Sequence, residues 1–331
     1  MYHGVVNVYK EKGYTSFDVI ALARGVFGQR KIGHTGTLDP QAEGVLPVCL
    51  GSASKLCGML TDTDKTYRAV MLLGVETDTQ DMTGTVTREK SAALVTDGDI
   101  RRALKAFTGE IDQIPPMYSA KKVGGKRLYD LAREGITVER KPSRVTIYDI
   151  NIERIELPHV TMTVRCSKGT YIRTLCHDIG QELGCGAAME SLVRTRAAGL
   201  DISDALSLDR LQSMKEEGSL ADALIPVDSF FKDCKAARVK SGASKLLLNG
   251  NPIKEEDVYI NNAEDAARQE NKTESGRRAD VRAQSVPGNT DLFAAPERNF
   301  RMYDAEGKFR AIYKYDIGRR TLYPVKMFLE D

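Results

Sequence analysis

The residues whose types and spacing could do chemistry lie in one short loop, Gly33–Pro40 (GHTGTLDP). Two glycines, two threonines and a proline in eight positions cannot continue a helix or a central strand, so a shaped loop is predicted. The loop presents an imidazole, His34, and a carboxylate, Asp39. A carboxylate can act as a nucleophile or as a general base. On composition alone, a structural turn capped by the Asp-Pro pair is the commoner interpretation.

Metal and nucleotide chemistry have little support in the sequence. The phosphate-binding patterns G-x-x-x-x-G-K-[ST] and G-x-G-x-x-G are both absent from the chain. The six cysteines form no C-x-x-C pair. Cys176, His177 and Cys185 come nearest to a metal cluster, but zinc ligands are usually paired more closely. These thiols are therefore predicted to be structural, with no metal bound.

The composition limits the class of protein. A chain of 331 residues exceeds most single domains, which favours two domains. No apolar run approaches the roughly 18 residues of a membrane helix, and no secretory signal opens the chain. A cytoplasmic protein without membrane association is therefore expected. The formal charge of +2 is so small that any binding of nucleic acid must depend on local basic patches.

The periodicity of apolar residues predicts an α+β fold. Strands and helices alternate without a regular βαβ rhythm, which favours a largely antiparallel sheet. Ser16 is expected to cap a helix that runs to about Gln29. The predicted strands are Gly4–Tyr9, Thr66–Leu73, Arg144–Ile155 and Val160–Cys166, and the other predicted helices are Asp99–Phe107 and Tyr171–Gly184.

A second, smaller unit is predicted at the C-terminal end, where short β-like segments are separated by turn signals. This pattern is typical of a small barrel. The polar segment from Asn261 to Pro296 (261–296) is predicted to be a flexible insertion in it. The β-like segments are Lys245–Leu248, Val258–Ile260, Phe300–Tyr303, Arg310–Tyr315 and Tyr323–Phe328.

Five sequence blocks, in order, resemble the TruB-type tRNA pseudouridine synthases, and they cover most of residues 1 to about 210. The longest includes the loop described above and continues as GHTGTLDPQAEGVLPVCLG. The C-terminal unit resembles the small RNA-binding barrel called PUA, with weaker motif support. The blocks are Lys10–Ser16 (KEKGYTS), Gly33–Gly51, Lys65–Arg68 with Thr77–Thr79 and Asp81–Gly84, Pro115–Tyr129 (PPMYSAKKVGGKRLY) and Ser167–Arg173 (SKGTYIR).

The resemblance implies both a fold and an activity. The fold would be a pseudouridine synthase domain at 1–232, with a central mixed, largely antiparallel sheet and an RNA cleft, followed by a PUA-like β-barrel domain at 233–331. The activity would be isomerisation of uridine 55 in the TΨC loop of tRNA, by base flipping and without a cofactor. Asp39 takes the position of the family's essential aspartate. The sequence leaves open whether Asp39 attacks C6, attacks C1′ or initiates elimination.

Four residues are expected by resemblance to complete the substrate pocket. Arg173 would pair with Asp39 and keep the pKa of that carboxyl low. Tyr67 matches the family's stacking tyrosine, and Tyr171 and Leu192 match positions that line the same pocket. Without the resemblance, a solvated arginine and ordinary core packing would be the simpler interpretations.

Two more residues are expected near the substrate by resemblance. His34 would stabilise the opened loop of the tRNA, and Lys10 would have an electrostatic or a structural role. The chain departs from the family pattern at Glu11, which replaces a usual proline, and at Glu43, which replaces a small residue. Glu43 lies four positions from Asp39, so its charge is a candidate cause of a raised Asp39 pKa.

A cluster of cations beside two glycines is predicted to contact the RNA backbone. A solvated basic face is the alternative interpretation. The expected partner is tRNA, through its T arm and with the barrel at its acceptor end, and the protein is expected to act as a monomer without a protein partner. The clustered cations are Lys121, Lys122, Lys126 and Arg127.

Two other classes of function remain open from the sequence. One is an RNA-binding or RNA-folding module in which catalysis is secondary. The other is a carboxylate-dependent hydrolase of nucleosides or RNA, for which only Glu43 offers a second acid. An isomerase that modifies a different RNA is a closer alternative.

Overall fold

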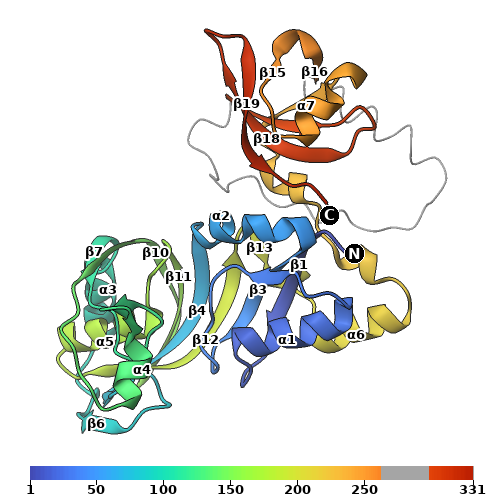
Figure 1. Cartoon of the computed structure of the whole chain (residues 1–331). Helices are drawn as coiled ribbons and strands as arrows, with labels where there is room; N and C mark the ends of the chain where they lie inside the picture. Colours follow the sequence, from blue (N-terminus) through green and yellow to red (C-terminus); the bar gives the residue numbers. More distant parts are fainter. Residues whose placement is uncertain (262–297, 331) are drawn as a thin grey trace.

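The protein consists of a large mixed sheet flanked by helices and a smaller barrel-like sheet at one end, as the computed structural model shows (Figure 1). The structure describes residues 1–261 and 298–330. Apart from Asn261, the insertion predicted at 261–296 lies outside these residues. No helix within the two ranges is long and apolar enough to cross a membrane. The predicted α+β architecture, with a largely antiparallel sheet and a small C-terminal barrel, is confirmed.

The large sheet has nine strands, seven of them in the order β1-β3-β12-β4-β11-β10-β7. Its neighbouring strands are antiparallel except for β12 and β3, which pair in parallel at Val193–Glu43 and Arg194–Gly44. β2 pairs with β3, and β13 pairs with β12. The strands are β1 (Gly4–Lys10), β2 (Ile32–His34), β3 (Glu43–Leu50), β4 (Lys65–Leu73), β7 (Gly109–Gln113), β10 (Ser143–Glu156), β11 (His159–Cys166), β12 (Ala187–Ala197) and β13 (Leu200–Asp201).

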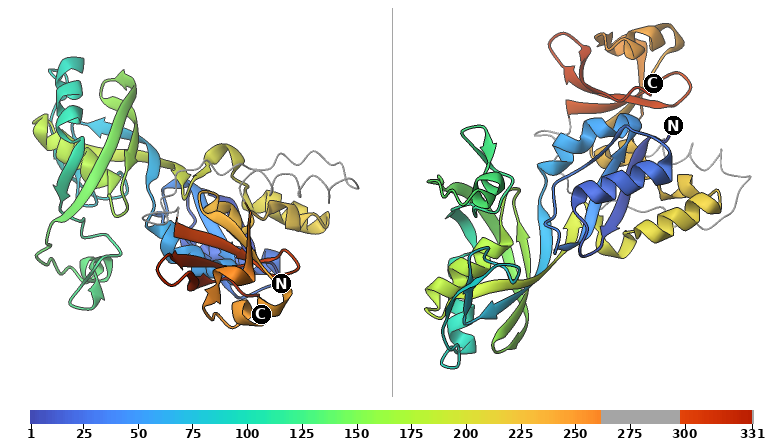
Figure 2. Two further views of the ribbon diagram at one scale, coloured as in Figure 1. Left: turned by 90° about the horizontal axis from the view of Figure 1, so that it is seen from above. Right: turned by 60° about the horizontal axis from the view of Figure 1, so that its bottom comes forward.

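Two helical layers cover separate halves of this sheet (Figure 2). Helices α1 (Ser16–Phe27) and α6 (Leu208–Glu216) pack on β1 and β3 through buried aliphatic side chains. Helices α3 (Asp97–Ala106) and α5 (Ile172–Glu182) pack on β4, β11 and β10 in a second core. Strands β4 and β12 join the two halves, so a site at this junction can receive groups from both.

The first helix is capped one residue earlier than predicted. Thr15, not Ser16, is the N-cap: its hydroxyl accepts from the backbone N–H of Asp18, and the Asp18 carboxylate accepts from the backbone N–H of Thr15. Such a reciprocal capping box satisfies two helix-terminal donors at once. Ser16 is buried and bonds to another segment, which is why its hydroxyl is not available to the helix.

The C-terminal sheet has six strands in the order β15-β19-β18-β17-β14-β16. One predicted strand is wrong: Lys245–Leu248 lies in the short helix α7 (Ser244–Leu248). The Asn249-Gly250 pair, a turn signal in the sequence, ends this helix: Gly250 adopts a positive φ, and its N–H bonds to Leu247 O. The strands are β14 (Lys235–Val239), β15 (Ile253–Lys254), β16 (Val258–Asn261), β17 (Asn299–Tyr303), β18 (Phe309–Asp316) and β19 (Thr321–Met327).

An aromatic cluster joins the barrel to the large sheet. The ring of Phe328 lies 5.8 Å from that of Phe231 and 5.6 Å from that of Phe309. These rings share one core with Val5 and Cys49 of the large sheet. The two units therefore bury apolar surface against each other, and the domain boundary between residues 232 and 233 stays a prediction.

Phe328→Ala tests this shared core. The ring is 2% exposed, so its removal leaves a cavity, and we expect the free energy of unfolding to fall by about 3 kcal/mol. Urea unfolding followed by circular dichroism measures the change. Leu94→Ala is the control, because Leu94 is 94% exposed and its truncation should leave the unfolding midpoint unchanged. Equal midpoints for the two variants would contradict the shared core.

Candidate active site

Lys10 ties the chain before α1 to the loop that carries Asp39. Its side chain is fully buried, and the ammonium donates to the carbonyls of Glu11 (3.1 Å), Tyr14 (2.6 Å) and Pro40 (3.2 Å). Burial lowers the pKa of Lys10 to about 8. Of the two roles left open by the sequence, this geometry favours the structural one, because all three bonds go to backbone oxygens.

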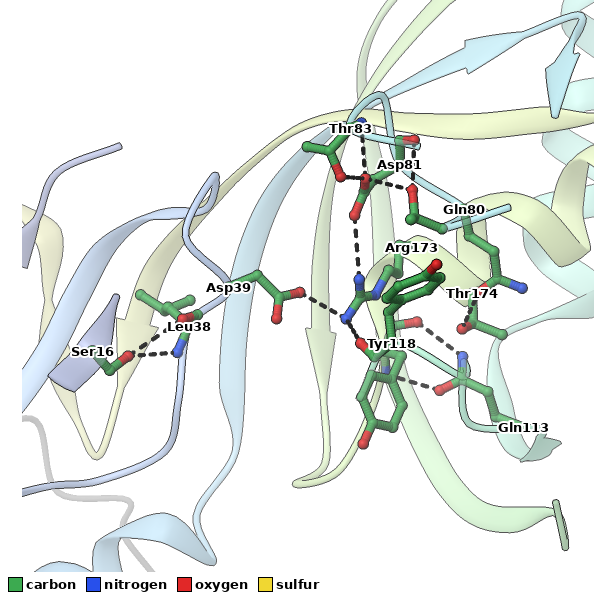
Figure 3. Close-up of polar contacts among 12 residues, drawn as sticks. Ser16, Leu38, Asp39, Gln80, Asp81, Thr83, Gln113, Tyr118, Arg173 and Thr174 are labelled. Atoms are coloured by element: carbon green, nitrogen blue, oxygen red, sulfur yellow. Dashed lines mark hydrogen bonds and ion pairs between the residues drawn. The ribbon is translucent and has the colours of Figure 1, made fainter. Parts of the chain in front are cut away.

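The start of α1 fixes the backbone next to Asp39. The Ser16 hydroxyl accepts from Leu38 N at 2.9 Å and donates to Leu38 O at 3.3 Å. After Asp39, the turn closes with a hydrogen bond from Ala42 N to Asp39 O. The loop Gly33–Pro40 is thus held on both sides of Asp39, and the Asp39 carboxylate projects toward the other half of the sheet (Figure 3).

Arg173, in the first turn of α5, meets Asp39 from that other half. Its guanidinium lies 2.9 Å from the Asp39 carboxylate and 3.2 Å from that of Asp81, and it donates to Tyr118 O at 2.7 Å (Figure 3). The Arg173 side chain is 7% exposed, whereas that of Asp39 is 46% exposed. The buried Arg173 guanidinium therefore pairs with two carboxylates, the accessible one of Asp39 and the buried one of Asp81.

Asp81 was not singled out as a site residue in the sequence, although it lies in one of the matching blocks. Its carboxylate accepts from the Thr79 hydroxyl at 2.8 Å and from Thr83 N at 2.9 Å, and its side chain is 13% exposed. The next residue ties this loop to β12, because Met82 N bonds to Met189 O. Asp81 is thus oriented toward Arg173 before any substrate binds.

The pKa of Asp39 moves in the opposite direction from the prediction. Burial raises it, the charges of Arg173 and Lys10 lower it, and the charge of Asp81 raises it, with a net shift above the ordinary value. The expectation of a low pKa is therefore wrong, because desolvation outweighs the ion pair. Glu43 is not among the causes; its carboxylate accepts from the Tyr9 hydroxyl at 3.3 Å.

A cavity of about 480 Å³ opens beside Asp39 and Arg173. The predicted pocket residues Tyr67 on β4, Leu192 on β12 and Tyr171 before α5 all line it. Tyr67 is packed so that burial raises the pKa of its phenol. A volume of this size is within the range of small-ligand sites, and its aromatic walls suit a planar ring.

Two buried polar residues that hold the pocket walls were not predicted in these roles. Gln113 clasps the backbone of Tyr171, accepting from Tyr171 N at 2.8 Å and donating to Tyr171 O at 3.0 Å. Arg194 is 1% exposed and donates to the carbonyls of Val45 (2.7 Å) and Gly36 (3.2 Å). Both side chains are buried, and this burial marks them as structural. The sequence pattern around them did not predict it.

The predicted cations lie on a hairpin that starts at the pocket edge. Ser119 and Ala120 line the pocket, and the hairpin β8 (Lys122–Val123) and β9 (Lys126–Arg127) follows, leading into α4 (Leu128–Arg133). Lys122, Lys126 and Arg127 are exposed. Lys121 is partly buried, and its ammonium donates to the Ser143 hydroxyl.

His34 is the last residue of β2 and lies near the start of the loop that carries Asp39. Its Nδ1 is buried without a hydrogen-bond partner, and its ring meets that of Phe17 edge to face. Burial, together with the charge of Arg194, lowers the pKa of His34. Unlike the pocket residues above, His34 does not line the cavity beside Asp39.

Comparisons with known proteins place this site in a family. The model of the TruB family pseudouridylate synthase N-terminal domain matches residues 24–172, and that of the tRNA pseudouridylate synthase B C-terminal domain matches residues 173–232. The protein named tRNA pseudouridine synthase B from Lachnoclostridium phytofermentans is 45% identical over 99% of this chain and 100% of its own length. This chain belongs to the TruB family of pseudouridylate synthases.

Other relatives agree with this assignment. The proteins of the same name from Alkaliphilus oremlandii and Clostridium tetani are 46% and 42% identical, each over 76% of this chain and over 83% and 86% of their own lengths. The solved structure titled "Crystal Structure of a Cbf5-Nop10-Gar1 Complex" contains a chain with the same fold, at a TM-score of 0.65 and 24% identity, covering 99% of this chain and 85% of that one. The TruB family enzyme described here is thus a pseudouridine synthase.

Asp81→Asn tests whether the Asp81 carboxylate orients Arg173. We expect the rate of pseudouridine formation to fall about tenfold or more, because Arg173 loses a partner that orients it. The acid limb of the pH–rate profile should move to lower pH. The role predicted for Asp39 requires the ionised carboxylate, and removal of a neighbouring negative charge lowers its pKa.

Asp78→Asn is the matched control, since Asp78 lies in the same loop and its carboxylate accepts from Thr85 N instead of pairing with Arg173. Single-turnover rates between pH 4 and pH 8 measure both effects. An acid limb that stays in place in Asp81→Asn, or an equal loss of rate in Asp78→Asn, would contradict the assigned role.

Proposed function

We propose that this enzyme converts uridine 55 in the T loop of tRNA to pseudouridine, with Asp39 as its catalytic residue and without a cofactor. The observation that carries the proposal is the half-exposed Asp39 carboxylate, paired with a buried arginine at the edge of an aromatic-walled pocket. The name tRNA pseudouridine synthase B, shared by relatives at 42–46% identity, supports tRNA as the substrate.

The reaction conserves atoms and electrons within the nucleotide. The C1′–N1 bond breaks, uracil rotates, the C1′–C5 bond forms, C5 loses its proton and N1 gains one. No oxidant, phosphate or group donor is needed. Asp39 can attack C6, attack C1′ or abstract a proton to start elimination, and in each case it acts first as an anion. Arg173 stabilises that anion and holds it at the pocket edge.

The pocket supplies the environment for a flipped base. A base that leaves its stack loses a few kcal/mol of stacking and pairing energy, which the protein must replace. The Tyr67 ring offers a stacking surface, and Leu192 and Tyr171 confine the base beside Asp39. Because Gln113 fixes the backbone of Tyr171, this wall is formed before substrate binds.

The exposed cations of the β8–β9 hairpin are assigned to the binding of the RNA backbone. They follow directly on the pocket wall, so a nucleotide in the pocket would bring its neighbouring phosphates near them. The C-terminal barrel is proposed to contact the acceptor end of the tRNA. The enzyme is proposed to act as a monomer.

Asp39→Asn tests the catalytic assignment. The substrate is an unmodified tRNA transcript with C5-tritiated uridine, with no metal or nucleotide added. We expect tritium release by the wild type and none by Asp39→Asn, because the amide is neither a nucleophile nor a base. The affinity for tRNA should change by less than about tenfold, since the protein still binds the phosphates. Turnover retained by Asp39→Asn would disprove the assignment.

The same assay distinguishes the substrate position and the competing functions. A transcript with only uridine 55 changed to cytidine should release no tritium with either protein. Release from that transcript would move the target to another uridine. Formation of free uracil would identify a hydrolase. If the wild type binds tRNA but releases no tritium, the protein is an RNA-binding protein without this activity.

Replacement of Lys122, Lys126 and Arg127 by serine tests the binding of the RNA backbone. The plot of log K against log[salt] should become shallower by about 2, because each phosphate that is no longer neutralised reduces the slope by roughly 0.7. Turnover at saturating tRNA should stay near the wild-type value. The control replaces the exposed Arg24, Arg210 and Lys215 of the α1–α6 layer. An equal change of slope in the control would show a general charge effect instead.

A further inference from the structure

Phe17 places a large apolar ring in solvent beside the catalytic loop. It is 70% exposed, more than any other Phe or Tyr in the described residues; Tyr259 follows at 58%. Exposed apolar side chains are common, but a phenyl ring with most of its surface in water forgoes the burial that usually stabilises it. Its position next to an active site makes a binding role worth testing.

The backbone of Phe17 is held in place from both sides. Ser16 bonds twice to Leu38, the residue before Asp39, and the capping box joins Thr15 to Asp18. The backbone that carries the ring is therefore tied to the loop that carries Asp39. A preorganised aromatic group loses little conformational entropy when a ligand stacks on it.

His34 forms the second side of the same surface. The two ring centroids lie 6.1 Å apart at an interplanar angle of 85°, which is an edge-to-face contact. The lowered pKa of His34 favours the neutral ring. Together, Phe17 and His34 form an uncharged aromatic corner, named here the Phe17 platform, outside the cavity beside Asp39.

We propose that the Phe17 platform stacks an unpaired base of the T loop other than the target uridine. This inference rests on the proposed function. Extraction of one base from an RNA loop unstacks its neighbours, and their exposed faces favour aromatic side chains. The cavity beside Asp39 accommodates the target, and Phe17 does not line it. The platform thus acts in binding and leaves the chemical step unchanged.

Phe17→Ala tests the stacking. Binding is measured with the full-length protein in the Asp39→Asn background, so that turnover does not alter the RNA. We expect Kd for the tRNA transcript to rise about tenfold and Phe17→Tyr to restore it. The control is Leu22→Ala, on the same helix and 45% exposed, which should leave Kd unchanged. In the otherwise wild-type enzyme, Phe17→Ala should raise KM with kcat within about twofold.

A scan of abasic nucleotides through the T loop, with the target uridine intact, identifies the stacked base. One abasic transcript should weaken binding to the parent protein as much as Phe17→Ala does, and should cause no further weakening in the Phe17→Ala protein. If the two effects multiply at every loop position, or if Phe17→Ala leaves Kd unchanged, the proposal is wrong. A dimer that Phe17→Ala dissociates, with tRNA binding unaffected, would instead assign the ring to a subunit interface.

Failure of this proposal can be told apart from failure of the proposed function. Tritium release by the wild type tests the reaction and its target, and it does not depend on Phe17. A wild type that isomerises uridine 55 while showing no coupling between Phe17 and any loop base would overturn the platform alone.

Discussion

Arg173 carries a positive charge that is almost removed from water, and the site is arranged around the compensation of that charge. A buried cation without partners would cost several kcal/mol, and two carboxylates compensate the charge of Arg173. Asp81 does so from a buried position with its own hydrogen bonds, and Asp39 does so from the accessible side. One carboxylate therefore orients the arginine, and the other remains available to a substrate.

The two ends of this ion-pair network come from different halves of the large sheet. The loop of Asp39 is held by Lys10 and Ser16 on the α1 side, whereas Arg173 begins α5 on the other side. Strands β4 and β12 connect these halves, and β12 pairs with β3 through only two residue pairs. The position of the pocket thus depends on the register of a few strands, which the surrounding apolar cores keep in place.

The sequence predicted elements well where a local pattern is strong. The alternation over Val160–Cys166 and Thr66–Leu73 agrees with β11 and β4 to within one residue. Predictions from local patterns were wrong where the same residues are typical of two different structures. Asn249-Gly250 suits a hairpin turn and a helix end alike, and in the structure the Gly250 N–H closes the end of α7 on Leu247 O. Ser16 is as good a cap as Thr15 by type, and its bond to Leu38 decides between them.

The sequence by itself determined where the site is predicted, because the loop with Asp39 and the blocks around Tyr67 and Arg173 are local and specific. Only the tertiary structure decided that Asp81 faces Arg173, that Gln113 clasps Tyr171 and that the pKa of Asp39 is raised. Electrostatic and hydrogen-bond energies depend on distance and on exclusion of water. Both arise when segments far apart in the chain pack together, and no local pattern encodes them.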